Sequence, residues 1–437
     1  MHLIIYDWQM KIGRLAEGSF VRNVVILMFG SGLSQLIPLL FSPVLSRLFT
    51  TSEFGVFTVF STVAAFLGVL ATFRYDLAIM LPKKKSDAFH LLALSVFIAL
   101  IISLIILIIT LLFARPIGRL LNTEELTPWL PFLALSILLL GISQSLNFWH
   151  NRNKSYKALS ANMISQSTTT AVVSTANGFA KMDAGGLIVG SLTGQLVSSV
   201  LYIFRFLKND KFRLKYISPR RIKYLAKKYI DYPKFSLPHR MVDMISITGI
   251  PLLLMMIFTE SVVGLYGFML RVLKAPIGVL AASLGQVFFQ QLSEKVSKNQ
   301  SVKNLFLKTI KNIAFITLPF FVLILLWGPD IFALIFSEQW REAGVYAQYL
   351  TPWLFLSSIS SPVSQLPLTL GYVKANMIAG ILNNSLLILT FLIASIFTET
   401  PQEIFLWVGI VMPIFYLCLI FWFYSLVKKY EKSRVLT

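Results

Sequence analysis

The chain has 437 residues, of which 56% are hydrophobic and only 13% charged, and its formal net charge is +20. A soluble domain carries about twice that share of charged residues, so the composition excludes an ordinary soluble protein and indicates one that spans a membrane. The basic residues lie in short segments between long apolar stretches, a distribution that argues against nucleic-acid binding.

The reactive side chains point to no cofactor and no metal. The single cysteine, Cys418, lies in an apolar stretch, so a disulfide framework is excluded. The four histidines are scattered without the spacing of metal ligands. We find no cleavable signal peptide, and residues 1–21 are expected to be a cytoplasmic or interfacial segment.

Twelve apolar stretches follow one another along the chain. A membrane-spanning helix needs about twenty predominantly apolar residues. The sequence therefore predicts an all-α integral membrane protein with helices at about 22–46, 54–80, 88–113, 129–149, 159–180, 185–207, 236–257, 261–290, 305–327, 345–370, 375–397 and 402–427. The fifth helix is rich in Ser, Thr, Asn and Gln, so it should be enclosed by neighbouring helices or line water.

The basic residues predict the orientation of these helices. With the N-terminus in the cytoplasm, 29 of the 39 Lys and Arg residues fall in the cytoplasmic segments and five in the outer loops. Cytoplasmic loops carry the excess of Lys and Arg, so both termini are predicted to be cytoplasmic. The longest loop, 208–228, alternates basic and apolar residues, which suits either a helix on an anionic leaflet or a basic linker between two halves.

An internal repeat relates the two halves of the chain. Residues 49–57 (FTTSEFGVF) and 258–266 (FTESVVGLY) match at Phe, Thr, Ser and Gly, with an offset of 209 residues. Two shorter matches follow in the same order and in equivalent loops: 117–121 with 331–335, and 156–158 with 372–375. The matches predict two six-helix lobes related by a pseudo-two-fold axis along the membrane normal.

This repeat gives the expected domain organisation. We predict an N-lobe at 22–207, a basic cytoplasmic loop at 208–235, a C-lobe at 236–427 and a cytoplasmic tail at 428–437. Transporters built from such repeats bind their substrate between the halves, near the midplane.

Two cations occur deep in the eighth helix. Arg271 and Lys274 are three residues apart, and Arg271 lies roughly 16 Å from the outer end of the helix, close to the midplane. An ionisable group at this depth costs about 2.5–3.5 kcal/mol on insertion scales, so it is a candidate for function. The two residues indicate an anionic substrate; the alternative is an ion pair with an acid on another helix.

Other ionisable residues lie nearer the cytoplasmic ends of their helices. Arg240 and Asp243 share one face and form either part of a binding site or a local pair. Arg74 and Asp76 are two apart and cannot pair within a helix, and either of them can instead extend to the interface. Arg74 and Arg240 are candidate substrate ligands, Asp76 and Asp243 are candidate proton-coupling groups, and Arg22 is a weaker ligand candidate that suits an interface anchor.

Uncharged polar side chains are spread over many of the predicted helices. Amides and hydroxyls along a cavity suit a sugar, although each alone is more often a helix–helix contact. The amides are Gln35, Gln144, Asn147, Gln166, Gln286, Gln365, Asn383 and Asn384.

Several stretches, taken together, resemble the Wzx-type polysaccharide flippases of the multidrug/oligosaccharidyl-lipid/polysaccharide exporter (MOP) superfamily. They are spread in order over most of the chain, at 45–57 (LSRLFTTSEFGVF), 73–81 (FRYDLAIML), 232–238 (YPKFSLP), 263–266 (VGLY), 271–276 (RVLKAP), 328–332 (GPDIF) and 340–344 (WREAG). Twelve helices fit this family, whereas the related peptidoglycan-precursor flippases usually have two more.

The resemblance implies a bacterial inner-membrane protein that moves a polyprenyl-pyrophosphate-linked oligosaccharide to the outer leaflet by alternating access. It implies a cationic cavity between the lobes, with Arg271 and Lys274 on one side and Arg74 on the other. The expected partners are the lipid-linked oligosaccharide, anionic lipid at 208–228, and polymerase and glycosyltransferases of the same pathway.

Three alternatives remain open at this stage. A multidrug or cation antiporter of the same superfamily favours acids inside the lobes, whereas bases outnumber acids here. A polysaccharide polymerase or glycosyltransferase needs large outer loops and a catalytic set, and the sequence offers neither, so no enzyme is expected. A scaffold protein leaves the intramembrane bases unexplained.

Overall fold

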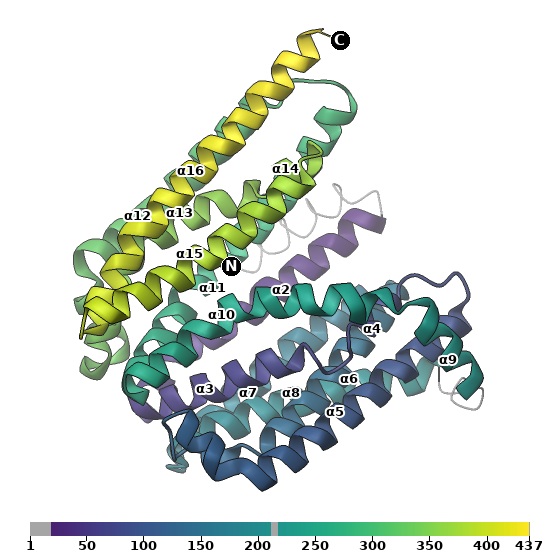
Figure 1. Ribbon diagram of the computed structural model, residues 1–437, viewed down its shortest axis with the longest axis vertical. Coiled ribbons are helices and arrows are strands. Elements are labelled where there is room, and N and C mark those ends of the chain that lie inside the picture. The colour runs from purple at the N-terminus through teal and green to yellow at the C-terminus, as the bar shows by residue number, and fades with distance from the viewer. Residues whose placement is uncertain (1–18, 211–216, 437) are drawn as a thin grey trace, which may run out of the picture.

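The computed structural model describes residues 19–210 and 217–436, with the side chains of a few of these left out, and this part of the chain contains helices and turns without a strand (Figure 1). Twelve long helices match the twelve predicted ones in order. They are α2 (Ser19–Leu48), α3 (Thr51–Gly68), α5 (Lys85–Leu120), α6 (Phe132–Arg152), α7 (Tyr156–Phe179), α8 (Asp183–Asp210), α10 (Leu237–Ile257), α11 (Glu260–Ser297), α12 (Lys303–Phe336), α13 (Arg341–Ser360), α15 (Val373–Phe397) and α16 (Pro401–Leu436).

Most of these helices are suited to crossing a membrane. Within the described residues, nine are long and apolar enough to do so, and a tenth is counted if the bent pair 232–245 and 248–257 forms one span. The polar helix α7 is not among them. It packs extensively against α2 and α8, as expected for a helix that must be shielded from lipid.

The second predicted helix is interrupted, so the prediction of one continuous helix to residue 80 is wrong. Helix α3 ends at Gly68, and Phe73 and Arg74 have positive φ angles of 48° and 64°, which a right-handed helix cannot contain. A four-residue helix, α4 (Tyr75–Ala78), follows. The buried carboxylate of Asp76 accepts a hydrogen bond from the hydroxyl of Thr72 at 2.8 Å across this turn. The apolar composition continues through the turn, so the sequence pattern did not indicate it.

The tenth predicted helix is also shorter than expected. Helix α13 ends at Ser360 and is followed by a 3₁₀ turn, η5 (Ser361–Val363), and a short helix, α14 (Leu366–Thr369). Pro362 and Pro367 lack the backbone N–H that a continuing helix would need.

The long helices form two lobes, which meet at one end and diverge toward the other (Figure 1). The cores show the same arrangement. One hydrophobic core contains residues from both lobes, among them Phe54, Phe268 and Trp340. A second core lies only in the N-lobe and a third only in the C-lobe. We call the region where the lobes share a core the closed end and the opposite region the open end.

The closed end is built from the two copies of the sequence repeat. Helices α3 and α11 pack closely, and Gly55 and Gly264 allow this approach. A Cβ atom added to Gly55 would overlap the carbonyl oxygen of Glu260, and one added to Gly264 would overlap that of Thr51. The two glycines are 209 residues apart, and so are the two carbonyl residues. The contact is therefore symmetric, as the pseudo-two-fold axis predicts.

Hydrogen bonds across the lobes add to this packing. The indole N–H of Trp340 and the side-chain amide of Gln339 both donate to the carbonyl oxygen of Ser46, at 2.8 and 2.6 Å. The hydroxyl of Ser52 donates to the carboxylate of Glu260 at 2.8 Å. The closed end is thus held by direct polar contacts as well as by apolar burial.

The segment between the lobes contains a helix, α9 (Pro219–Lys228), within the basic stretch predicted at 208–228. Residues 211–216 of that stretch lie outside the described part of the chain. Helix α9 is at the open end, where it packs on α5 of the N-lobe.

Candidate functional site

Arg271 and Lys274 lie in the middle of α11, yet both side chains are exposed. A side chain that is exposed midway along a helix enclosed by neighbours must face an open space. The guanidinium of Arg271 lies 5.2 Å from the ring centre of Phe57 in the N-lobe, and the ammonium of Lys274 lies 5.8 Å from that of Trp353 in the C-lobe. Neither cation has an ion pair with a carboxylate in the described residues.

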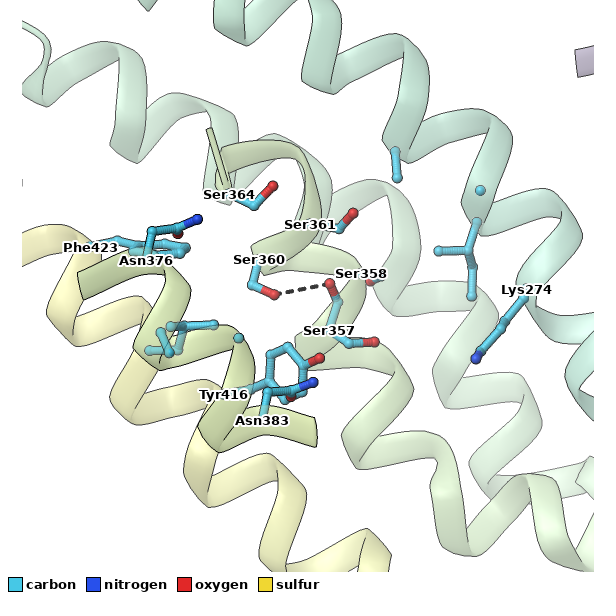
Figure 2. A pocket seen from close by; sticks show the side chains of 16 residues that line it. Lys274, Ser357, Ser358, Ser360, Ser361, Ser364, Asn376, Asn383, Tyr416 and Phe423 are labelled. Carbon is cyan, nitrogen blue, oxygen red and sulfur yellow. Dashed lines mark hydrogen bonds between the residues drawn. The ribbon is translucent and has the colours of Figure 1, made fainter. Parts of the chain in front are cut away.

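Lys274 lines a cavity of about 530 Å³ within the C-lobe, between α11, α13, α15 and α16 (Figure 2). This volume is in the range of a site for a small ligand. The polar residues that line it are Lys274, Ser357, Ser358, Ser360, Ser361, Ser364, Asn376, Asn383 and Tyr416. Lys274 is the only charged residue in the lining, so the cavity is a cationic one.

Three of the cavity serines have already used their hydroxyl protons. The hydroxyls of Ser357, Ser358 and Ser360 each donate to the backbone carbonyl three residues earlier, at 2.9, 2.7 and 3.1 Å. A hydroxyl oxygen has two acceptor lone pairs besides its donor. These serines can therefore accept hydrogen bonds from a ligand without losing any bond that they make now.

Two further serines and an amide complete the polar wall. In the described chain, the side chains of Ser361 and Ser364 make no hydrogen bond, so they can both donate and accept. The amide nitrogen of Asn383 donates to the side-chain oxygen of Asn384 at 3.2 Å, while its own side-chain oxygen is buried and has no partner. A buried acceptor without a donor is costly, and a ligand hydroxyl would satisfy it.

The cavity thus combines one cation with a surface rich in acceptors. An anionic group suits the position beside Lys274, and a polyhydroxyl group suits the acceptors of α13 and α15. Of these groups, sequence analysis identified only Lys274 and Asn383 individually. It missed the five serines at 357–364, although five serines in eight residues of an apolar span are a signal of a polar surface.

Arg240 and Asp243 lie away from this cavity. They are near the start of α10 and form a local ion pair at 3.8 Å, and the ring of His239 lies 3.6 Å from the same carboxylate. All three side chains are partly or largely exposed.

Arg74 and Asp76 lie in the turn after α3 and do not line the C-lobe cavity. Asp76 is buried and engaged by Thr72, whereas the Nε atom of Arg74 is buried and makes no hydrogen bond in the described residues. Arg22 belongs to the first turns of α2, and its side chain lies outside the described part of the chain.

The described residues contain no group of three or more His, Cys, Asp or Glu side chains that could hold a metal ion. The candidate site is therefore described by its cation, amides and hydroxyls alone.

Solved structures with the same architecture define the class of fold. The chain is similar to lipid II flippase MurJ in an inward closed conformation, with a TM-score of 0.71 and 14% identity over 94% of this chain and 92% of that one. It is also similar to an inward-facing multidrug resistance MATE family transporter of the MOP superfamily, with a TM-score of 0.56 and 17% identity over 93% and 94% of the two chains. A MOP superfamily transporter from Pyrococcus furiosus matches with a TM-score of 0.57 and 15% identity over 94% and 96%. The protein therefore has the two-lobed MOP transporter fold.

The family follows from the sequence itself. Residues 44–344, more than half of the chain, match the family model described as "Polysaccharide biosynthesis protein". The chain belongs to this family, and it is a multi-pass membrane protein. The resemblance to Wzx-type flippases is confirmed at this level. A search of curated protein sequences finds no match.

Proposed function

We propose that this protein is a flippase that moves a polyprenyl-pyrophosphate-linked oligosaccharide from the inner to the outer leaflet of the bacterial inner membrane. The observation that carries the proposal is the C-lobe cavity, where Lys274 stands beside hydroxyl and amide acceptors and no carboxylate takes part in the lining. Family membership and fold support transport of a lipid-linked saccharide. The kind of glycan is not specified by these features.

The proposed binding step uses the two kinds of group in the cavity. The pyrophosphate approaches from the open end and is neutralised by Lys274, with Arg271 on the same helix available at the boundary between the lobes. The sugars donate hydrogen bonds to the serines of α13 and to Asn383. The lipid tail stays in the bilayer.

The proposed transport step is a rocking of the lobes that separates the closed end and brings the open end together. With both termini in the cytoplasm, the open end faces the cytoplasm, which is where the substrate is expected to enter. An inside-negative potential drives an anion outward by about 2.3 kcal/mol per charge per 100 mV, so roughly 4–5 kcal/mol for two charges. Asp76 and Asp243 remain candidates for additional proton coupling.

The cavity chemistry also separates the proposal from its main alternative. An exporter of cationic drugs needs carboxylates at its site, and the lining of this cavity contains none. Catalysis by a polymerase or glycosyltransferase would need groups that this lining lacks. Polymerase and glycosyltransferases of the same pathway remain predicted partners.

Complementation of a flippase-deficient strain tests the proposal. The variant Lys274→Gln combined with Arg271→Gln should abolish surface polysaccharide while its level in the membrane stays normal. The variant Lys311→Gln removes an exposed charge from α12, outside the cavity, and should leave complementation intact. Full activity of the double variant would remove both cations from the mechanism.

A further inference from the structure

The N-lobe contains a second large hollow, an apolar groove of about 510 Å³ between α5, α6 and α8. Every residue that lines it is apolar, in contrast to the C-lobe cavity. The lining includes Phe89 and Leu100 of α5, Leu207 near the end of α8, and Ile217 just before α9. The groove therefore reaches the open end beside α9.

The length of the groove fits one leaflet of a bilayer. From Phe89 to Leu100 it follows eleven residues of α5, which is roughly 16 Å along a helix. The hydrocarbon core of a bilayer is about 30 Å thick, so the groove extends from the open end to about the midplane. An acyl chain of a phospholipid has this reach, whereas a polyprenyl chain is much longer.

The mouth of the groove is basic. Lys208 directly follows Leu207 of the lining, and Arg220 lies three residues after Ile217. Both side chains are exposed, and neither makes an ion pair in the described part of the chain. Two free cations are thus placed where the apolar lining ends.

Helix α9 holds this basic mouth in a fixed position. The guanidinium of Arg221 makes two hydrogen bonds of 2.8 Å with the carboxylate of Asp87 at the start of α5. Leu225 is buried in the N-lobe core, and the hydroxyl of Tyr75 donates to the carbonyl oxygen of Ala226 at 3.0 Å. The helix is therefore docked on the N-lobe and does not merely float on the membrane surface.

We propose that this groove binds one acyl chain of an anionic glycerophospholipid from the leaflet at the open end, with Lys208 and Arg220 contacting its phosphate. Lipid tails are as apolar as the lining, so the groove alone gives no preference among lipids. The preference comes from the basic mouth, because Lys and Arg near the surface attract anionic lipid. The inference specifies a lipid site for the basic 208–228 segment and does not depend on the transported substrate.

Native mass spectrometry of the purified protein tests this site, with phosphatidylglycerol and phosphatidylcholine as probes at equal concentration. The wild-type protein should bind phosphatidylglycerol more tightly. The variant Lys208→Gln with Arg220→Gln should weaken that binding about 25-fold, from about fivefold per charge. The matched variant Lys227→Gln with Lys228→Gln removes two exposed charges from the far end of α9 and should weaken it much less.

A third variant tests the groove itself. Ala93 lines the groove, and Ala93→Trp should fill it and reduce the binding of both lipids while the basic mouth is unchanged. Equal binding of the two lipids to the wild-type protein would overturn the proposal. So would an equal loss in the two charge variants, which would show general attraction to α9, or unchanged binding in Ala93→Trp.

Discussion

Gly55 and Gly264 occupy equivalent places in the two halves of the chain, and each faces a backbone carbonyl of the opposite helix so closely that no Cβ atom fits. Helices α3 and α11 meet at this pair, and the lobes diverge from it (Figure 1). The repeated glycine of the sequence is thus the contact on which the closed end is built.

Substitution of either glycine should therefore open the closed end. In Gly55→Ala the added methyl group overlaps the carbonyl oxygen of Glu260, so α3 and α11 must separate. With Cys418 replaced by Ser, cysteines at Ser52 and Glu260, whose side chains are hydrogen-bonded in this structure, report closure by disulfide cross-linking. The cross-linked fraction should fall several-fold in the Gly55→Ala background.

Gly249 provides the matched control for this experiment. It lies in α10, and an added Cβ atom there meets nothing within 4 Å. Gly249→Ala should leave the cross-linked fraction unchanged. An undiminished fraction in Gly55→Ala would show that the glycine contact does not maintain closure.

The serines of α13 should matter for transport more than for folding. Replacement of Ser357, Ser358 and Ser360 by Ala removes three acceptors from the cavity wall. Since each hydrogen bond contributes about 0.5–1.5 kcal/mol, the triple variant should lose at least tenfold in transport rate at limiting substrate. Ser395→Ala removes a serine that bonds the preceding turn of α15 in the same way, outside the cavity, and should retain activity.

The melting temperature of the triple variant separates the two roles. A fall of many degrees together with lost transport would assign the serines to packing. Lost transport with a nearly unchanged melting temperature is the expected result.

Glu125 should make stability depend on pH. Partial burial and the neighbouring carboxylates of Glu260, Glu53 and Asp183 raise the pKa of Glu125 above its usual value. A raised pKa means that the folded protein holds this proton more tightly than the unfolded chain does, so stability should fall as pH rises from the ordinary glutamate pKa through the raised one. The melting temperature in detergent should decrease over this window.

Glu125→Gln should flatten this dependence because it removes the titrating group. The adjacent exposed residue allows a control, and Glu124→Gln should keep the wild-type pH profile. A profile that is the same in wild type and Glu125→Gln would assign the effect to other groups.

The pair between Asp87 and Arg221 should determine whether α9 stays docked. The carboxylate of Asp87 raises the pKa of Arg221, so this cation is charged at every working pH. Asp87→Asn should increase hydrogen exchange at 219–228 several-fold, because one of the attachments of α9 is weakened. Lys223→Gln removes an exposed charge of the same helix without touching the pair, and unchanged exchange is expected there.

Much of the fold could be predicted from the sequence because lipid imposes a simple rule on it. Twelve apolar stretches predicted twelve helices, and the repeat at 49–57 and 258–266 indicated the two lobes. The break at Phe73 and Arg74 could not be predicted, because left-handed residues leave no mark on apolar composition.

The site was predictable only in part. The depth of Arg271 and Lys274 was visible in the sequence, but periodicity placed them on one face and suggested one partner. In the structure Arg271 lies against Phe57 of the N-lobe and Lys274 lies against Trp353 of the C-lobe, since side-chain direction depends on neighbouring helices. The acceptor role of the serines depends on which protons the backbone already holds, which only coordinates can give.

The account depends most on Lys274 as the cation that receives a phosphate-bearing lipid. The most direct test is the equilibrium affinity of the purified protein for undecaprenyl pyrophosphate, with Lys274→Gln compared with Lys311→Gln. A charge-assisted contact contributes about 1.5–3 kcal/mol, so Lys274→Gln should bind at least tenfold more weakly while Lys311→Gln binds as the wild type does. Equal affinity in all three proteins would contradict the account.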